Sequence, residues 1–286
     1  MQRKRIALWF GAAAAAACLS VGAGEKAPPI RGPIGLQLYS LRDYFKTDVP
    51  GTLAKVREMG FRFVELAGTY GLSPEKFSAL LKENGLRAVA GHFPYERFQN
   101  DPEGVAKEAK ALGLRYVGCA WIPHRGDFDE AECREAVKTF NRAGRLLAAQ
   151  GLRFYYHNHG YEFQPYGDGT LMDLLIKETS PRFVSFQMDL LWTVFPGQDP
   201  AFWLKKYPRR WRLMHLKDLR KGVKGDLSGS TDTRNDVALG TGQVDLPAVL
   251  RTARKTGVRW FFIEDESPDA LKQIPVSVKF LQSFKW

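Results

Sequence analysis

Eight short apolar runs recur along the chain, and most of them end at or beside a polar residue. They are rich in aromatic and β-branched residues, which is typical of strands buried on both faces of a parallel sheet. The predicted strands cover residues 34–39, 61–66, 86–92, 114–120, 152–157, 183–189, 211–217 and 258–264.

The segments between these runs carry apolar residues at helical spacing. Several begin with Asp, Ser or Thr, which cap helices, and Pro74 and Pro102 suit a first helical turn. The predicted helices cover residues 53–59, 74–84, 101–112, 129–150, 170–178 and 245–256. This alternation of strands and helices indicates a parallel α/β architecture.

Five of the strands follow a glycine, an apolar residue and an arginine. Each glycine closes a helical stretch, where a residue without Cβ adopts the left-handed conformation most easily. The glycines are Gly60, Gly85, Gly113, Gly151 and Gly257. Eight strand–helix units predict a single-domain (β/α)8 TIM barrel. An open doubly wound sheet would place a glycine-rich loop after the first strand, and residues 38–43 contain no glycine.

Residues 1–23 have the pattern of a signal peptide. Basic residues at 3–5 precede an apolar run at 6–18, and small residues follow at 21–23. The run is shorter than the roughly 18 to 20 residues of a membrane span, so cleavage is favoured over stable membrane insertion. We expect a Pro/Gly linker at 24–33 and a periplasmic or secreted barrel at 34–286. A lipid anchor at Cys18 is a minor alternative.

The formal net charge of +11 raises the question of an anionic partner. The Lys and Arg residues are scattered at helix ends and strand starts, without the clustered stripe of a nucleic-acid groove. We therefore expect no nucleic-acid partner. Beyond Cys18, only Cys119 and Cys133 remain, which argues against a disulfide framework.

Three of the apolar runs end on Asp189, His215 and Glu264. In a barrel these side chains converge on one mouth, and each is costly to bury unpaired. A shared divalent cation, Mn²⁺, Co²⁺, Mg²⁺ or Zn²⁺, explains all three together. The alternative is that separate hydrogen bonds satisfy each residue.

The fifth strand contributes the densest group of polar side chains in the chain. His157 and His159 have the same strand parity, so both can face the mouth while Asn158 points away. Glu162 follows in the loop. A buried polar network that stabilises the rim is the alternative to a ligand or base role.

In this order, the strand-end motifs resemble those of the sugar phosphate isomerase/epimerase superfamily, the xylose isomerase-like TIM barrels. The resemblance covers nearly all of residues 34–286 and is greatest to an exported branch with Tyr-His-Asn-His in strand 5. The segments that carry it are 35–40, 63–66, 156–159, 187–189, 215–218, 240–245 and 263–264.

The resemblance implies one divalent metal held by Glu, Asp, His and Glu from strands 5 to 8. Asp189, His215 and Glu264 match the last three, but His157 stands where the first glutamate is expected. Either His157 is itself a ligand, or Glu162 replaces the lost carboxylate. Epimerases of this superfamily use the two glutamates on opposite faces of the sugar, so this departure argues against simple epimerisation.

The metal would polarise a sugar carbonyl, and one base then suffices for isomerisation or elimination. Glu264 or Glu162 is the candidate base, with His159 as an acid. Lys217 is expected to hold a sugar oxygen or the developing oxyanion. Further residues are expected at the sugar site: Gln37, Glu65 and His92 at strand ends, and Trp192, which either stacks on the sugar or packs in its loop. The polar segment 219–242 is expected to cover the substrate.

These observations predict a metal-dependent enzyme that acts on a non-phosphorylated sugar, keto-sugar or glycoside. It would remove a proton next to a carbonyl, as an isomerase or epimerase does, or in elimination and hydration of a 3-keto-glycoside. One alternative is a non-catalytic periplasmic carbohydrate-binding protein. Another is an endonuclease IV-like nuclease, but its three-zinc site needs more histidines than this chain's five.

Overall fold

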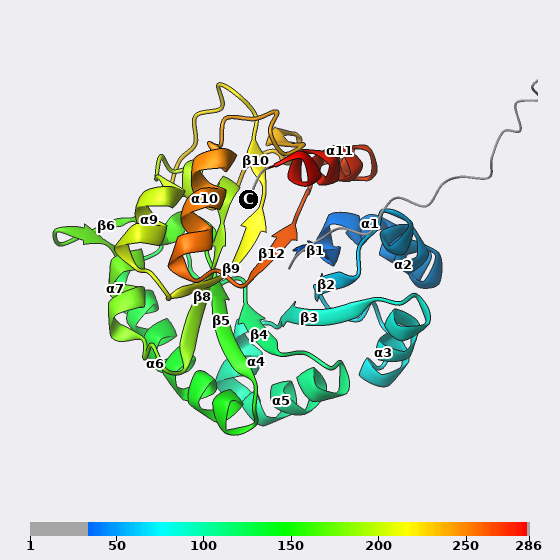
Figure 1. The fold of residues 1–286 in the computed structure, drawn as a ribbon. Helices are drawn as coiled ribbons and strands as arrows, with labels where there is room; N and C mark the ends of the chain where they lie inside the picture. Colours follow the sequence, from blue (N-terminus) through cyan, green and yellow to red (C-terminus); the bar gives the residue numbers. More distant parts are fainter. Residues whose placement is uncertain (1–33, 285–286) are drawn as a thin grey trace, which may run out of the picture.

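Eight parallel strands close into a barrel ringed by helices in the computed structural model, which describes residues 34–284 (Figure 1). Strand β1 pairs with both β2 and β12, which completes the ring. The strands are β1 (Ile34–Gln37), β2 (Phe63–Leu66), β3 (Arg87–His92), β4 (Tyr116–Cys119), β5 (Arg153–His157), β8 (Val184–Asp189), β9 (Trp211–Leu216) and β12 (Trp260–Ile263). The predicted single-domain barrel is confirmed, whereas the predicted signal peptide and linker lie outside the described residues.

The outer helices begin where the sequence places caps. Side chains of Asp48, Ser73, Asp101, Asp129 and Thr170 each accept a hydrogen bond from a backbone N–H in the first turn. The main outer helices are α2 (Val49–Glu58), α3 (Pro74–Glu83), α5 (Pro102–Ala111), α6 (Glu130–Ala149), α7 (Leu171–Glu178), α9 (Pro200–Lys206), α10 (Leu246–Thr256) and α11 (Ala270–Ser283).

Two of these helices were not expected from the apolar spacing. Helix α9 is only seven residues long, and α11 carries Pro275 in its interior, so neither shows a clean helical pattern in the sequence. The five predicted glycines behave as expected, with φ between 63° at Gly85 and 104° at Gly257. Each allows the chain to turn from a helix into the next strand.

A small aromatic core fills the barrel beneath the strand ends. It consists of Val89, Ala90, Tyr116, Tyr155, Leu213 and Phe262. Gly118 makes room for the Tyr155 ring, because a Cβ at this position would lie 2.2 Å from that ring. The Tyr155 hydroxyl can therefore reach Glu65, 2.5 Å away, at the base of the polar group described below.

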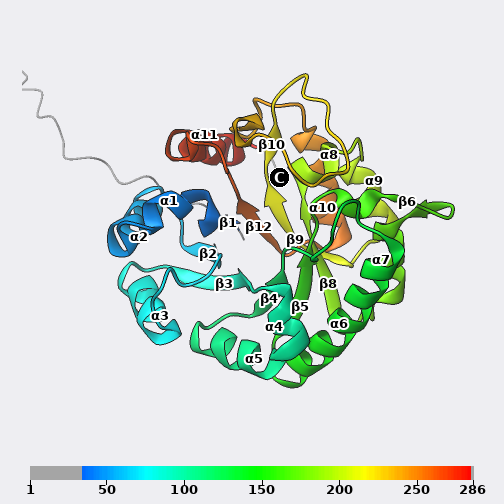
Figure 2. The same ribbon diagram turned by 180° about the vertical axis from the view of Figure 1, so that it is seen from behind.

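Short elements follow the carboxyl ends of the strands, and one hairpin among them projects outward from the barrel (Figure 2). Two of them, β10 (Asp218–Leu219) and β11 (Asp236–Val237), pair antiparallel and bracket the long loop after β9. The others are η1 (Leu38–Leu41), α1 (Arg42–Phe45), α4 (Tyr95–Asn100), η2 (Tyr161–Phe163), β6 (Pro165–Tyr166), β7 (Gly169–Thr170), α8 (Leu190–Val194) and η3 (Thr233–Asn235).

The Asp218 carboxylate fixes the far end of this long loop. It accepts hydrogen bonds of 2.9 to 3.0 Å from the backbone N–H groups of Gly240, Gly242 and Val244. The predicted polar segment is therefore anchored at both ends over the mouth. Among residues 34–284, no helix combines the length and apolar character needed to cross a membrane.

Candidate metal and substrate site

Four buried side chains from adjacent strands converge at the carboxyl end of the barrel. They are His157 on β5, Asp189 on β8, His215 on β9 and Glu264 just after β12, and one ligand atom from each lies within 4.8 Å of the others. The Asp189 Oδ2 atom lies 3.3 Å from His157 Nε2 and 3.5 Å from His215 Nδ1. His215 Nδ1 also lies 2.9 Å from Glu264 Oε2.

The donor set of this group fits a divalent cation. His215 Nδ1 is buried and makes no hydrogen bond of acceptable geometry, although two carboxylates lie beside it. Two buried carboxylates would repel each other without positive charge between them. Two imidazoles with two carboxylates suit Zn²⁺, Mn²⁺ or Co²⁺. His157, Asp189, His215 and Glu264 would therefore be the residues that hold the ion.

A second carboxylate sets the orientation of His215 from below. His215 Nε2 donates to Glu65, because the Glu65 carboxylate is ionised and can only accept. Burial alone would raise the pKa of Glu65, but the charges of His215 and His92 and the hydrogen bonds lower it to about 2. Nδ1 of His215 is thus left as the ligand atom, as in other carboxylate–histidine pairs beside metals.

Two residues expected to contact the sugar lie below the cavity instead. Gln37 and Glu65 are fully buried, and Gln37 donates to Glu65 at 2.9 Å. Gln187 also donates to Glu65, at 2.9 and 3.1 Å. Their expected place on the sugar-binding wall is corrected here: neither side chain lines the cavity, and the contacts of Glu65 with Gln37 and His215 place both residues under His215.

Glu162 does not join the group of potential ligands. Gly160, with φ of 95°, turns the chain so that the Glu162 carboxylate points back to its own loop. There it accepts the Tyr156 hydroxyl and the backbone N–H groups of His159 and Gly160. Burial raises the pKa of Glu162 to about 7. The structure does not support the alternative in which Glu162 replaces the missing glutamate. Glu162 does not line the cavity either, so its expected role as a base is not supported.

Lys217 lies behind the cavity wall rather than on it. Its side chain is 1 % exposed, and its ammonium contacts Glu266 and lies 3.4 Å from Glu264 and 3.5 Å from Asp236. Burial opposes the charge, but these carboxylates raise the pKa of Lys217 well above its usual value. Lys217 therefore neutralises and positions acidic residues, and the expected direct contact with a sugar oxygen is not formed in this arrangement.

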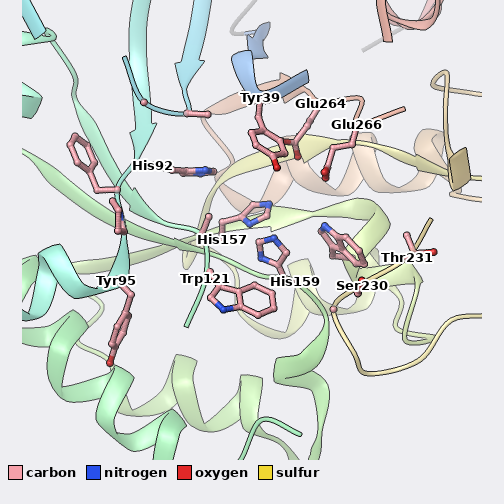
Figure 3. Close-up of a pocket in the computed structure, with 17 residues that line it drawn as sticks. Tyr39, His92, Tyr95, Trp121, His157, His159, Ser230, Thr231, Glu264 and Glu266 are labelled. Carbon is pink, nitrogen blue, oxygen red and sulfur yellow. The ribbon is translucent and has the colours of Figure 1, made fainter. Parts of the chain in front are cut away.

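A cavity of about 710 Å³ opens above the four potential ligands (Figure 3). His92, His157, His159, Trp192 and Glu264 all lie on its wall, in agreement with the sequence-based expectation. The loop after β9 adds Gly229, Ser230 and Thr231, so the expected covering role of this segment has a structural basis.

His159 is the imidazole with the fewest partners in this cavity. Its Nδ1 atom is buried without a hydrogen-bond partner, and its ring lies 4.7 Å from that of His157. Burial, together with the nearby His157, lowers the pKa of His159 well below its usual value. The ring is therefore neutral near pH 7, with one ring nitrogen able to donate a proton and the other able to accept one.

Trp121 and Glu266 are among the cavity residues that sequence reasoning missed. Each lies two positions beyond a strand-end residue, Cys119 in the first case and Glu264 in the second. The same two-residue step relates His159 to His157. Residues with the parity of an inward-facing strand end reach the next level of the mouth. Extending the parity argument to every strand would have found both.

Comparison with known proteins places this arrangement in a family. The family model described as xylose isomerase-like TIM barrel matches residues 53–284. The chain belongs to this family. It is 30% identical to inosose dehydratase 2 of Bacillus cereus over 233 residues, which cover 77% of this chain and 75% of that protein. The expectation of an enzyme is thereby confirmed.

Solved structures give the same result for the fold. A sugar phosphate isomerase/epimerase from Parabacteroides distasonis has a TM-score of 0.73 at 25% identity, over 88% of this chain and 98% of that one. The IOLI protein, solved with a zinc atom, has a TM-score of 0.65 at 12% identity, over 87% of this chain and 95% of that one. The family identification made from the strand-end motifs is therefore confirmed.

Proposed function

We propose that this member of the family is a divalent-metal-dependent lyase that acts on a non-phosphorylated keto-sugar. It removes a proton next to the carbonyl and expels an oxygen substituent from the neighbouring carbon. The observation that carries the proposal is the pairing of His157, in the ligand group, with the unpartnered His159 beside it. The similarity to an inosose dehydratase supports an elimination, because a dehydratase removes water.

A divalent ion held by His157, Asp189, His215 and Glu264 would polarise the carbonyl and stabilise the negative charge that develops on its oxygen. The protein residues handle the proton. His159 takes it from the carbon next to the carbonyl, the carbon–carbon double bond forms, and the bond to the leaving oxygen breaks. The imidazolium then returns the proton to that oxygen, which departs as water or an alcohol.

This assignment explains why elimination is favoured over epimerisation. Epimerisation needs a base on each face of the sugar, whereas elimination with return of the proton to the leaving group needs one. Glu264 belongs to the group of potential ligands and lies 3.4 Å from the Lys217 ammonium, so it is not free to act as a second base. His159 has no such partner, so the proton transfer is assigned to one face.

The cavity wall also supports a substrate without phosphate. Among the described residues that line it, none is Lys or Arg, whereas Glu264 and Glu266 are both present. Beyond the reach of the proposed ion, a phosphate group would meet these carboxylates without a compensating side-chain cation, because Lys217 is closed off behind them. Export through the leader at residues 1–23 remains a prediction that agrees with a free sugar or glycoside as substrate.

The test is turnover by protein loaded in turn with Mn²⁺, Co²⁺, Mg²⁺ or Zn²⁺, on a keto-inositol and on a methyl 3-keto-glucoside. We expect the absorbance of an unsaturated ketone to appear only with metal. His159→Asn should lower kcat by roughly 10²- to 10⁴-fold while one divalent ion stays bound. Metal-free turnover, or proton exchange without elimination, would contradict the proposal.

The matched control is His124→Asn. The His124 ring also lies at this end of the barrel, but it stacks on Trp121 and contacts the Ile122 carbonyl at 2.7 Å. It therefore has no place in the proposed proton transfer. Turnover of the keto-inositol should be nearly unchanged in this variant. An equal loss of turnover in His159→Asn and His124→Asn would contradict the assignment of the proton transfer to His159.

A further inference from the structure

Trp121 is one of two large, exposed side chains on the wall of the cavity. Its side chain is 43 % exposed, and it forms part of the wall of the 710 Å³ cavity (Figure 3). Tyr39, at 42 %, is likewise exposed and lies on the same wall. Large apolar side chains left open beside a catalytic group commonly mark the place where a ligand supplies the missing contact.

The Trp121 ring is nevertheless held in one position. It stacks on His124 with centroids 4.9 Å apart and meets the edge of Tyr161 at 4.8 Å. Tyr161 is itself fixed, because its hydroxyl accepts the backbone N–H of Ile122 at 2.9 Å. A rigid aromatic surface binds a flat or ring-shaped group with little loss of conformational freedom.

The position of Trp121 relates it to the leaving group. Its ring lies edge-on to that of His159, with centroids 5.3 Å apart. His159 is the residue proposed to protonate the departing oxygen. A substituent carried by that oxygen would therefore extend over Trp121, toward the exposed part of the mouth.

The cavity has room for more than one sugar ring. At about 710 Å³ it falls within the roughly 300–1,000 Å³ typical of pockets for drug-sized ligands. Ser230 and Thr231 add hydroxyl groups to the same wall from the loop after β9. The outer part of the cavity thus combines an aromatic surface with polar groups, a combination that suits a sugar or aryl ring.

We propose that the substrate is a keto-glycoside whose leaving group carries a second ring, and that this ring stacks on Trp121. The inference rests on the proposed elimination and makes it more specific. The bond that breaks joins the sugar carbon to the glycosidic oxygen, and the departing alcohol takes the proton held by His159. Free keto-inositols, which release water, would leave the Trp121 surface empty.

The experiment measures binding without turnover, in metal-loaded protein carrying His159→Asn. Phenyl and methyl 3-keto-β-D-glucopyranoside are titrated by calorimetry, and the ratio of their dissociation constants is taken. We expect the phenyl compound to bind roughly 3- to 10-fold more tightly. Trp121→Leu should bring the ratio close to one, and Trp121→Phe should retain most of the preference.

Phe202→Ala is the control, because Phe202 on α9 is 50 % exposed but lies outside the cavity. An unchanged ratio in Trp121→Leu, or the absence of any preference for the phenyl compound, overturns the subsite. Metal-dependent dehydration of keto-inositol would then leave the proposed function standing. A Trp121-dependent preference without any metal-dependent elimination would support the subsite and overturn the proposed function.

Discussion

Glu65 on β2 accepts a hydrogen bond from Nε2 of His215 on β9, although β1 and β12 lie between these strands in the barrel. The contact therefore runs through the barrel interior rather than along neighbouring strands. It fixes the proton of His215 on Nε2 and turns Nδ1 toward Asp189 and Glu264. The metal affinity of the four potential ligands should thus depend on Glu65, which is not itself a ligand.

Glu65→Gln should weaken metal binding by roughly 10- to 100-fold while the four potential ligands remain in place. The amide has one acceptor atom in place of the two charged oxygens, so His215 loses its fixed proton position. The measurement is competition for Zn²⁺ or Mn²⁺ against a chromophoric chelator. Glu96→Gln, at an exposed residue of α4, is the control. Equal metal affinity in Glu65→Gln and the unaltered protein would show that metal binding by His215 does not depend on its hydrogen bond to Glu65.

His157→Glu should shift the preference of the site among metals. The substitution places a third carboxylate beside Asp189 and Glu264 and removes one imidazole, and oxygen ligands favour Mn²⁺ and Mg²⁺ over Zn²⁺. We expect the ratio of Mn²⁺ to Zn²⁺ affinity to rise by roughly tenfold or more, as measured by titration calorimetry. His157→Ala should weaken both metals instead, and unchanged affinities for both metals in His157→Ala would mean that residue 157 does not contact the ion.

Glu162 should make the folded state less stable as the pH rises. Burial raises its pKa from 4.5 to about 7 in the folded protein. Between these two values the unfolded chain has already released the proton that the folded chain still holds, so the free energy of unfolding falls with increasing pH. The contribution is fully present below pH 4.5 and is lost above pH 7.

Glu162→Gln removes this titration. Relative to the unaltered protein, the variant should gain up to about 3 kcal/mol between about pH 5 and pH 8, as measured by urea unfolding at both values. Glu58→Gln, at an exposed residue of α2, should show no such change. A difference in stability that is the same at both pH values would mean that Glu162 titrates normally in its loop.

Local patterns predicted most of the barrel because they are set by neighbours in the chain. Gly151, for example, ends α6 and starts β5 by its own positive φ of 81°. The end of each strand was equally readable, since the apolar run stops where the side chains reach the polar mouth. Asp189, His215 and Glu264 were therefore placed together correctly, whereas His157 was one of two candidates for the fourth position, beside Glu162.

The remaining errors concern how far along the barrel axis a side chain lies and in which direction a loop turns it. Gln37 and Glu65 have the parity of site residues, but register places them in the layer under His215. The direction of Glu162 depends on the turn at Gly160, and the position of Lys217 depends on partners that are distant in sequence. Contacts between residues that are distant in sequence cannot be predicted from local periodicity.

Residues at the strand ends and residues two positions further along the chain form two tiers of the mouth, which differ in their proposed functions. His157 and Glu264 belong to the lower tier, whereas His159, Glu266 and Trp121 form the upper one. A mutation in the upper tier exchanges the groups that meet the substrate and leaves the ion-holding residues intact. Substitutions in the upper tier can therefore alter the reaction while the four potential metal ligands stay the same.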